Sequence, residues 1–194
     1  MIKNFVIDYV KKIKHSNNVS DIYKKYFKGD CITPVFTHKN DVYVVYKKKE
    51  KLFRKFSITK NGAKKIKNDY NGLKWYCSKK KIITKKIIQQ YVSKNKFSYI
   101  DTTNIKGTKI KSWLPLSKNY IYIKRSLDHY TKIFNKKKKM KIHGDLTLEN
   151  IFFKNKNVFF IDWEFFNSKK SWGYDAVYLV LSSVSLPFIA NETF

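Results

Sequence analysis

The stretch Lys141-Ile-His-Gly-Asp-Leu-Thr-Leu-Glu-Asn-Ile-Phe-Phe153, followed by Val158-Phe-Phe-Ile-Asp-Trp-Glu164, carries the strongest structural signal in this 194-residue chain. Two short apolar runs flank a polar turn within residues 151–161, a pattern that predicts a β-hairpin. Asn150 comes directly before the first strand and Asp162 directly after the second. We therefore expect both side chains to lie at one end of a rigid scaffold.

Asp145 and Asn150, five residues apart, indicate the chemistry of this segment. An aspartate at the start of a loop can face a substrate hydroxyl while an asparagine further along faces Mg²⁺. Magnesium prefers carboxylate and carbonyl oxygens and keeps several waters. Asn150 and Asp162 would supply two oxygens and leave the remaining coordination to a triphosphate and water. The spacing favours metal-assisted phosphoryl transfer.

His143-Gly-Asp-Leu-Thr-Leu-Glu-Asn150, together with Ile161-Asp-Trp-Glu164, resembles the motif of the aminoglycoside phosphotransferase and choline kinase family. These are small-molecule kinases of protein-kinase-like fold. The resemblance implies an α+β fold of two lobes, with ATP and Mg²⁺ as cofactors. A small antiparallel-sheet lobe would occupy residues 1–103, and a mostly helical lobe with the catalytic-loop hairpin would occupy residues 104–194.

The same resemblance implies roles for single residues. Asp145 would be the catalytic base or the residue that orients the acceptor hydroxyl, and His143 would brace the loop. Asn150 and Asp162 would bind magnesium. The segment Trp172-Gly-Tyr-Asp175 resembles the next landmark of the family, whose aspartate opens a helix and ties the catalytic loop.

The interval between Asp162 and Asp175 leaves no room for a long activation segment. Gly144 stands where protein kinases have the arginine that reads a phosphorylated activation segment. Both features favour a small hydroxylated acceptor over a protein substrate. The resemblance thus implies an enzyme, a kinase that phosphorylates a hydroxyl of a small molecule or of a cell-envelope glycan.

The first hundred residues predict the amino-terminal sheet. Runs at 32–36, 41–46 and 51–57 have the apolar and β-branched content of strands linked by polar turns, and 97–100 predicts a further strand. Residues 61–76 predict a helix. The turn after the first strand contains no glycine, so a glycine-rich phosphate cradle is absent.

The family pattern singles out Arg54 on the third strand as the phosphate-binding cation, with Lys55 as the alternative. Adjacent strand residues face opposite sides of a sheet, so only one of the two can point at phosphate, and both stay open. Asp69 matches the acid that pairs with this cation. Adenine is expected near Tyr99 and Asp101.

The carboxy-terminal half predicts two further helical segments. Residues 117–135 show the apolar spacing of an amphipathic helix. Residues 176–190 are apolar, yet too short to span a bilayer and interrupted by Pro187. Because the chain stops at Phe194, we expect it to lack the additional acceptor-binding helices of the family, either as a compact member or as a truncated copy.

A net charge of +28 would ordinarily indicate a polyanionic partner such as nucleic acid or membrane. Nearly all of this charge is lysine, in a composition rich in Asn, Ile, Tyr and Phe that is typical of an AT-rich genome. We interpret it as solvated surface and do not expect nucleic acid binding. Lysine runs at 47–51, 79–81 and 136–139 favour peripheral contact with anionic lipid or a phosphorylated glycan.

The alternative function is a non-catalytic basic binding module, or a degenerate kinase fold that recognises an anionic polymer. Cys31 and Cys77 fit no metal or disulfide spacing, and residues 1–10 read as a short amphipathic helix without a signal-peptide core. We expect a cytoplasmic protein, with peripheral binding to the inner face of the membrane as a further possibility for its location.

Overall fold

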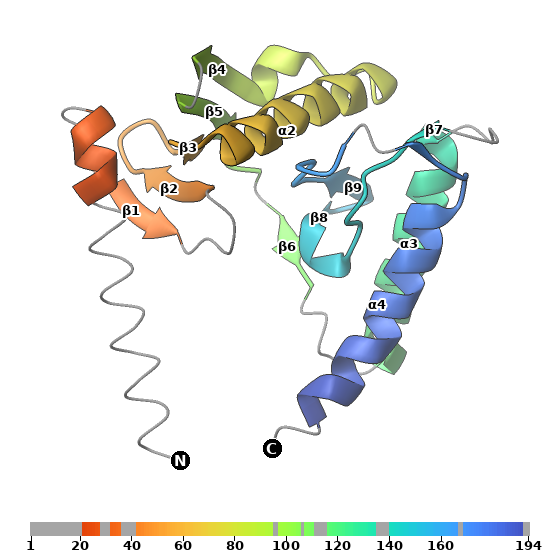
Figure 1. The fold of residues 1–194 in the computed structure, drawn as a ribbon. Coiled ribbons are helices and arrows are strands. Elements are labelled where there is room, and N and C mark those ends of the chain that lie inside the picture. Colours follow the sequence, from red (N-terminus) through yellow and green to blue (C-terminus); the bar gives the residue numbers. More distant parts are fainter. Residues whose placement is uncertain are drawn as a thin grey trace, which may run out of the picture. The chain divides into compact units, whose positions relative to one another are not determined.

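The structure is a computed structural model, and Figure 1 shows its fold. It describes residues 21–27, 32–35, 42–94, 97–105, 107–110, 116–134, 140–166 and 169–191. The helix expected at 1–10, the turn at 37–41 and the lysine run at 136–139 lie outside the described residues.

The chain divides into two compact units. The first contains residues 1–66 and 89–104, and the second contains residues 67–88 and 105–194. One long helix, α2 (Lys60–Lys79), carries the boundary between 66 and 67.

The first unit is built on a five-stranded sheet with the order β1-β2-β3-β5-β4. The pairs β1–β2, β2–β3 and β3–β5 are antiparallel, which confirms the predicted antiparallel sheet. β4 was not predicted, because its sequence Ile-Gln-Gln-Tyr-Val-Ser-Lys does not alternate between apolar and polar residues. In the structure most of its side chains are exposed or half-buried. The strands are β1 (Ile32–Val35), β2 (Tyr43–Lys47), β3 (Leu52–Ser57), β4 (Ile88–Lys94) and β5 (Phe97–Thr103).

A small aromatic core fills one face of this sheet. Tyr23, from a helical turn at residues 21–26, packs with Val45 and Phe56 from neighbouring strands. Phe27 packs edge-on against Phe56 with ring centroids 5.5 Å apart. The helical turn is thereby fixed to the sheet.

Local capping sets the two ends of α2. The Thr59 hydroxyl accepts a hydrogen bond from the Gly62 amide at 3.1 Å, an N-cap that satisfies one orphan donor. At the other end Lys81 adopts a positive φ of 55°, and the Ile82 amide donates to the Cys77 carbonyl at 2.9 Å. This is the bond pattern of a Schellman stop, with lysine in the usual glycine position. A 3-10 turn, η1 (Thr84–Lys86), follows.

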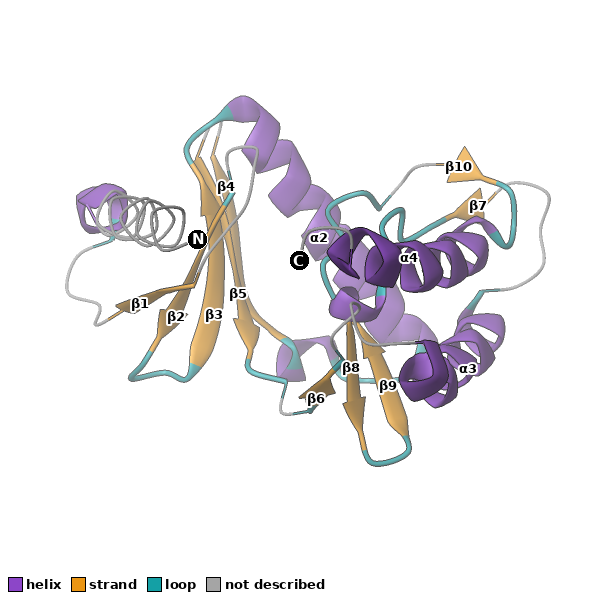
Figure 2. Ribbon diagram, turned by 90° about the horizontal axis from the view of Figure 1, so that it is seen from below, coloured by secondary structure: helices purple, strands orange, loops and turns teal. Residues whose placement is uncertain are grey.

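Two helices dominate the second unit beyond residue 105. α3 (Leu116–Ile133) confirms the predicted amphipathic helix, and it packs against α4 (Tyr174–Asn191). Figure 2 shows the two helices side by side. Among the helices of the described ranges, none has the length and apolar character needed to cross a membrane.

Short strands complete this unit, and they confirm the predicted hairpin. β8 (Ile151–Lys154) and β9 (Asn157–Phe160) pair antiparallel through a turn in which Asn155 has a φ of 53°. β6 (Thr108–Lys109) adds to β8, and β7 (Met140–Lys141) pairs with β10 (Lys169–Lys170).

Aromatic side chains form the core beneath the hairpin. Trp163 is fully buried and lies near Tyr76, with ring centroids 5.2 Å apart. Gly72 of α2 permits this packing, because a Cβ there would come within 2.4 Å of the Trp163 Cβ. The second half of α2 is thus an integral part of the second unit.

Candidate active site

The β8–β9 hairpin brings Asn150 and Asp162 to the same end of its ladder. Ile151 pairs with Phe160, and the Ile161 amide donates to the Asn150 carbonyl at 2.9 Å, which extends the pairing by one residue. Asp162 follows immediately, with a positive φ of 64° that ends the extended strand. The hairpin therefore positions both residues from a rigid base.

Asn150 also contacts Asp145 directly. Its Nδ2 donates to the Asp145 carbonyl oxygen at 2.8 Å and to Asp145 Oδ2 at 3.2 Å. Asn150 occupies the end of the 3-10 turn η2 (Leu148–Asn150), which folds the chain back toward Asp145. Because both donated bonds come from Nδ2, the amide oxygen is left as a candidate metal ligand.

His143 braces the loop from the interior. It is 0% exposed, its Nε2 donates to the Ile161 carbonyl at 2.8 Å, and its Nδ1 accepts from the Asp145 amide at 3.4 Å. Burial lowers the pKa of this imidazole, which favours the neutral form that these two contacts require. The His143 ring thus connects the two ends of the site, Asp145 and the residue before Asp162.

The Asp175 carboxylate ties the start of the loop to α4. Oδ2 accepts from the His143 amide at 2.7 Å and Oδ1 accepts from the Gly144 amide at 2.8 Å. This confirms the expectation that the aspartate of the Trp-Gly-Tyr-Asp segment opens a helix and holds the loop. Burial raises the pKa of Asp175, although the two amide bonds and His143 oppose the rise.

Gly144 is required by the shape of the loop. Its φ is 90°, and an added Cβ would lie 2.6 Å from the Cβ of Phe165. Both the backbone conformation and the close approach exclude a side chain at this position.

Asp69 holds the segment that follows Asp162. Its Oδ1 accepts from the Trp163 amide at 2.8 Å, and the neighbouring Asn68 donates through Nδ2 to the Glu164 carbonyl at 3.0 Å. Asp69 is buried on α2. Asp69, which was expected to pair with the phosphate-binding cation, accepts a hydrogen bond from the backbone amide next to the candidate metal ligand.

Arg54 forms a buried ion pair with Asp101. The two residues are direct partners in the β3–β5 register, and Arg54 Nε and Nη2 each lie 2.6 Å from an Asp101 carboxylate oxygen. Burial alone would lower the pKa of the guanidinium, but the hydrogen bond and charge of Asp101 outweigh it and raise the pKa. The bidentate geometry is the strongest form of such a pair.

Aromatic rings cover the same guanidinium. The Arg54 Cζ lies 4.2 Å from the Phe27 ring centroid and 4.4 Å from the Tyr99 centroid, and Nη1 donates to the Tyr23 hydroxyl at 3.3 Å. Tyr99 and Asp101, which were expected near adenine, thus both contact the Arg54 guanidinium. Lys55, next along β3, belongs to the opposite face of the sheet.

The donor set of Asn150 and Asp162 fits magnesium in kind. Both offer hard oxygen ligands, and Mg²⁺ ordinarily takes only one or two protein carboxylates along with water and phosphate oxygens. Within the described ranges, no three His, Cys, Asp or Glu side chains gather as an all-protein metal site. An amide oxygen and a carboxylate of this kind suit a metal that is held jointly with a phosphate ligand.

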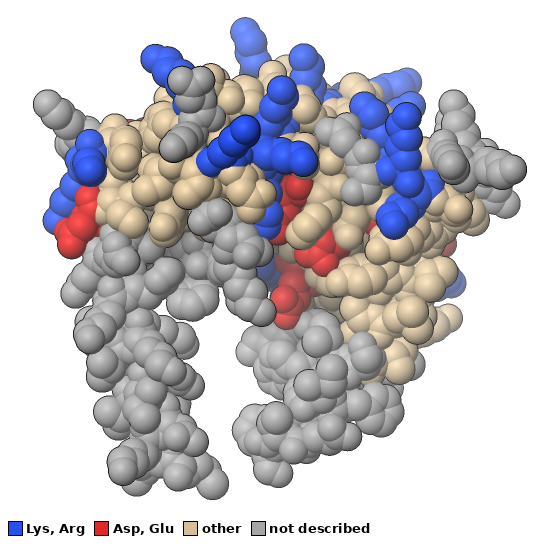
Figure 3. Space-filling view, in the orientation of Figure 1, with Lys and Arg blue, Asp and Glu red and all other residues tan. Residues whose placement is uncertain are grey.

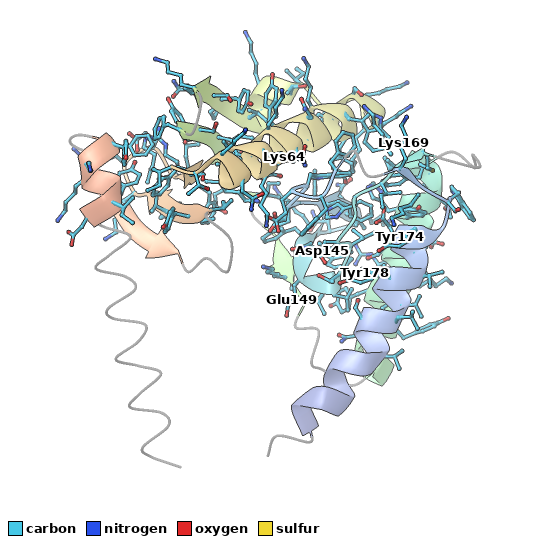
Figure 4. All side chains as sticks on the ribbon, in the orientation of Figure 1. Lys64, Asp145, Glu149, Lys169, Tyr174 and Tyr178 are labelled. Carbon is cyan, nitrogen blue, oxygen red and sulfur yellow. The ribbon has the colours of Figure 1, made fainter. Side chains whose placement is uncertain are left out.

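Two contacts, one in each unit, were not anticipated from the sequence. One is the Arg54–Asp101 pair, which only the β3–β5 register brings together. The other joins the Tyr178 hydroxyl to the Asp145 carboxylate, and Figure 4 labels both residues. The i, i+4 spacing of Tyr174 and Tyr178 marks one helix face, but nothing in the sequence alone indicates that this face meets Asp145.

Comparison with solved structures identifies the architecture. The chain aligns with APH(2")-IIia in its GDP and kanamycin complex at a TM-score of 0.54, with 12% identity, covering 88% of this chain and 78% of that one. The fold is protein-kinase-like. The structure of the streptomycin-ATP-APH(2")-IIa ternary complex aligns at a TM-score of 0.46, with 12% identity, covering 79% of this chain and 71% of that one.

This protein-kinase-like fold confirms the predicted fold class of an antiparallel-sheet part followed by a mostly helical part with a catalytic-loop hairpin. No protein-family model matches the chain, and no curated protein matches it in sequence. At 12% identity the likeness concerns the fold, so the function must be argued from the residues of the site.

Proposed function

We propose that this chain is an ATP- and Mg²⁺-dependent phosphotransferase that moves the γ-phosphate to a hydroxyl of a small molecule or a cell-envelope sugar. The observation that carries the proposal is the constellation at the hairpin end. Asn150 bonds Asp145 and shares its end of the hairpin with Asp162. These are the oxygen-bearing groups that phosphoryl transfer needs, in the order and spacing expected.

In the proposed reaction, Asp145 receives the proton of the acceptor hydroxyl. The hydroxyl oxygen forms a bond to the γ-phosphorus while the bond from that phosphorus to the bridging oxygen breaks, and ADP leaves with the electron pair. Asn150 Nδ2 fixes the orientation of the Asp145 carboxylate through its 3.2 Å bond to Oδ2. His143, neutral and buried, keeps the Asp145 backbone in place.

Asn150 and Asp162 would hold the magnesium ion, which supplies charge neutralisation on the phosphates when bound. Asp69 supports this function by anchoring the backbone after Asp162 through the Trp163 amide. The backbone that follows Asp162 is thus itself held by a buried carboxylate.

Lys55 is the better candidate for the cation that contacts the nucleotide phosphates. Arg54 is engaged by both Asp101 oxygens and enclosed by two aromatic rings. Recruiting Arg54 to phosphate would leave a buried carboxylate unpaired, which is costly. Lys55 lies on the other face of β3, away from the Arg54–Asp101 pair.

The nucleotide is proposed to be ATP, although the similar APH(2")-IIia structure holds GDP. Isothermal titration with Mg·ATP and Mg·GTP in parallel distinguishes the two. Tighter binding of Mg·GTP would correct the nucleotide assignment and leave the phosphotransferase proposal standing.

Two variants test the roles in the site. Asp145→Ala should abolish transfer of the γ-phosphate while leaving nucleotide affinity unchanged, and Asp162→Ala should remove magnesium-dependent nucleotide binding. Asp128, exposed on α3, gives the control variant Asp128→Ala. Turnover that persists at the wild-type rate in Asp145→Ala would refute the proposed mechanism.

The basic surface supports a competing function as a polyanion-binding module. Figure 3 shows lysine and arginine side chains gathered along the upper part of the face in view, with few acids among them. Such a module would bind a polyanion such as heparin with a steep salt dependence and would show no thermal shift with Mg·ATP. Measuring both properties on the wild-type chain decides between the two functions.

A further inference from the structure

Helix α4 presents two tyrosines beside the proposed catalytic carboxylate. Tyr174 and Tyr178 lie one turn apart, with their rings parallel within 2° and their centroids 6.4 Å apart. They are 40% and 38% exposed, whereas Leu179 and Ser183 on the same helix are buried. The two rings therefore belong to the surface rather than to the α3–α4 packing.

The Tyr178 hydroxyl connects this aromatic face to the chemistry. The Asp145 carboxylate lies close enough to this hydroxyl to influence it, and the two labelled side chains lie close to each other in Figure 4. Partial burial and the Asp145 charge both raise the pKa of the phenol, which keeps it protonated and able to donate. The Asp145 carboxylate thus has Asn150 Nδ2 bonded to it and the Tyr178 hydroxyl beside it, from different elements.

Lysines border the other end of the tyrosine pair. Lys170 Nζ lies 5.4 Å from the Tyr174 ring centroid, a cation–π distance, and Lys169 pairs with Lys141 across the β10–β7 ladder. These cations repel a positively charged ligand from the Tyr174 side.

We propose that Tyr174 and Tyr178 form the acceptor-binding wall of the site for a neutral or anionic sugar, with Tyr178 as a positioning residue for Asp145. This inference rests on the proposed phosphotransferase function. Tyrosine rings offer an apolar face to the C–H face of a sugar and a hydroxyl at the rim. A sugar lying on Tyr174 and Tyr178 would present its hydroxyls next to the group that removes the proton.

Direct binding of sugars tests the wall independently of catalysis. Saturation-transfer NMR on the full chain would use glucose, glucose 6-phosphate and kanamycin as probes. Tyr174→Ala should weaken binding of the two non-cationic sugars by about tenfold, the loss expected for a well-packed contact. Tyr120→Ala, which removes a 62% exposed tyrosine from α3, is the matched control and should leave binding unchanged.

Steady-state kinetics test the positioning role of Tyr178. Tyr178→Phe keeps the ring and removes the hydroxyl, so it should lower kcat by about tenfold, as for a lost hydrogen bond to a charged group, and leave the acceptor KM unchanged. A merely structural role would instead change the melting temperature without this separation of kcat from KM.

The outcomes separate the wall from the phosphotransferase function. A wild-type chain that binds sugar through Tyr174 but never binds Mg·ATP would support the wall and refute the kinase. A chain that binds Mg·ATP but none of the sugars, or binds kanamycin more tightly than both, would overturn the wall. Unchanged sugar binding in Tyr174→Ala, or unchanged kcat in Tyr178→Phe, would overturn it as well.

Discussion

Asp175 Oδ2 accepts a hydrogen bond from the His143 backbone amide at 2.7 Å, and this bond joins the first turn of α4 to the loop that contains Asp145. The second oxygen of the same carboxylate accepts the next amide, that of Gly144. One side chain thus satisfies two consecutive backbone donors of the loop.

Replacing Asp175 by asparagine should therefore destabilise the loop. The amide keeps one acceptor oxygen and turns the other into a donor that faces a backbone N–H. We expect a loss of about 2 kcal/mol in the free energy of unfolding, measured by urea denaturation. Asp128→Asn on the exposed face of α3 is the control, and an equal effect of the two variants would contradict the assignment.

Gly144→Ala and Gly173→Ala separate backbone strain from steric clash. Both glycines have a φ near 90°, but an added Cβ meets Phe165 at position 144 and nothing within 4 Å at position 173. The backbone strain of alanine at a positive φ, which is common to both variants, should lower the free energy of unfolding by about 1–2 kcal/mol. Thermal unfolding should show a clearly larger loss for Gly144→Ala, and a larger loss for Gly173→Ala would contradict the close contact with Phe165.

Removing the charge of Arg54 and removing that of Lys55 should affect different properties of the protein. Arg54→Met leaves the buried Asp101 carboxylate without its partner and should cost about 3 kcal/mol or more of stability. The double variant Arg54→Met/Asp101→Leu should recover most of that loss. Unfolding by urea measures both.

Lys55→Met should weaken Mg·ATP binding while the chain stays folded, because it leaves the Arg54–Asp101 pair intact. Calorimetric titration with Mg·ATP measures the change in nucleotide affinity. Normal affinity in Lys55→Met combined with lost affinity in a stably folded Arg54→Lys would assign the phosphate contact to Arg54 instead.

His129 should make the stability of the protein depend on pH. Its Nε2 lies 2.8 Å from the Tyr76 hydroxyl, and burial, together with the charges of Lys80 and Lys132, lowers the pKa of His129 from 6.5 to about 4. The unfolded chain therefore binds more protons than the folded one between these values, so stability is complete above about 6.5 and decreases toward about 4.

The melting temperature measured across this pH range tests the prediction. His129→Gln should reduce the slope without abolishing it, because burial also lowers the pKa of His143. A slope that stays the same in His129→Gln would show that His129 does not titrate in this way.

The hairpin and its flanking polar residues could be predicted because their signals are local. Two runs of branched and aromatic residues on either side of a turn specify β8 and β9, and Asn150 and Asp162 then follow from strand geometry alone. The same holds for α2 and α3, whose apolar spacing is helical. Such patterns predict structure that depends on residues close together in the sequence.

Contacts between distant segments could not be predicted from the same patterns. The Arg54–Asp101 pair depends on the alignment of β3 with β5, across 47 residues of sequence. The bond from Trp163 to Asp69 crosses 94 residues. β4 escaped prediction for a different reason, because its glutamines and lysine give no apolar period.

The grouping of residues 67–88 with residues 105–194 has a consequence for synthesis on the ribosome. The sheet of the first unit is complete once residue 104 has emerged, whereas the second half of α2 must wait for Trp163 and Phe160, made much later. Until then Leu73, Tyr76 and Cys77 lack the surfaces that bury them in the finished protein. During translation, this half-helix is where a chaperone would find exposed apolar side chains.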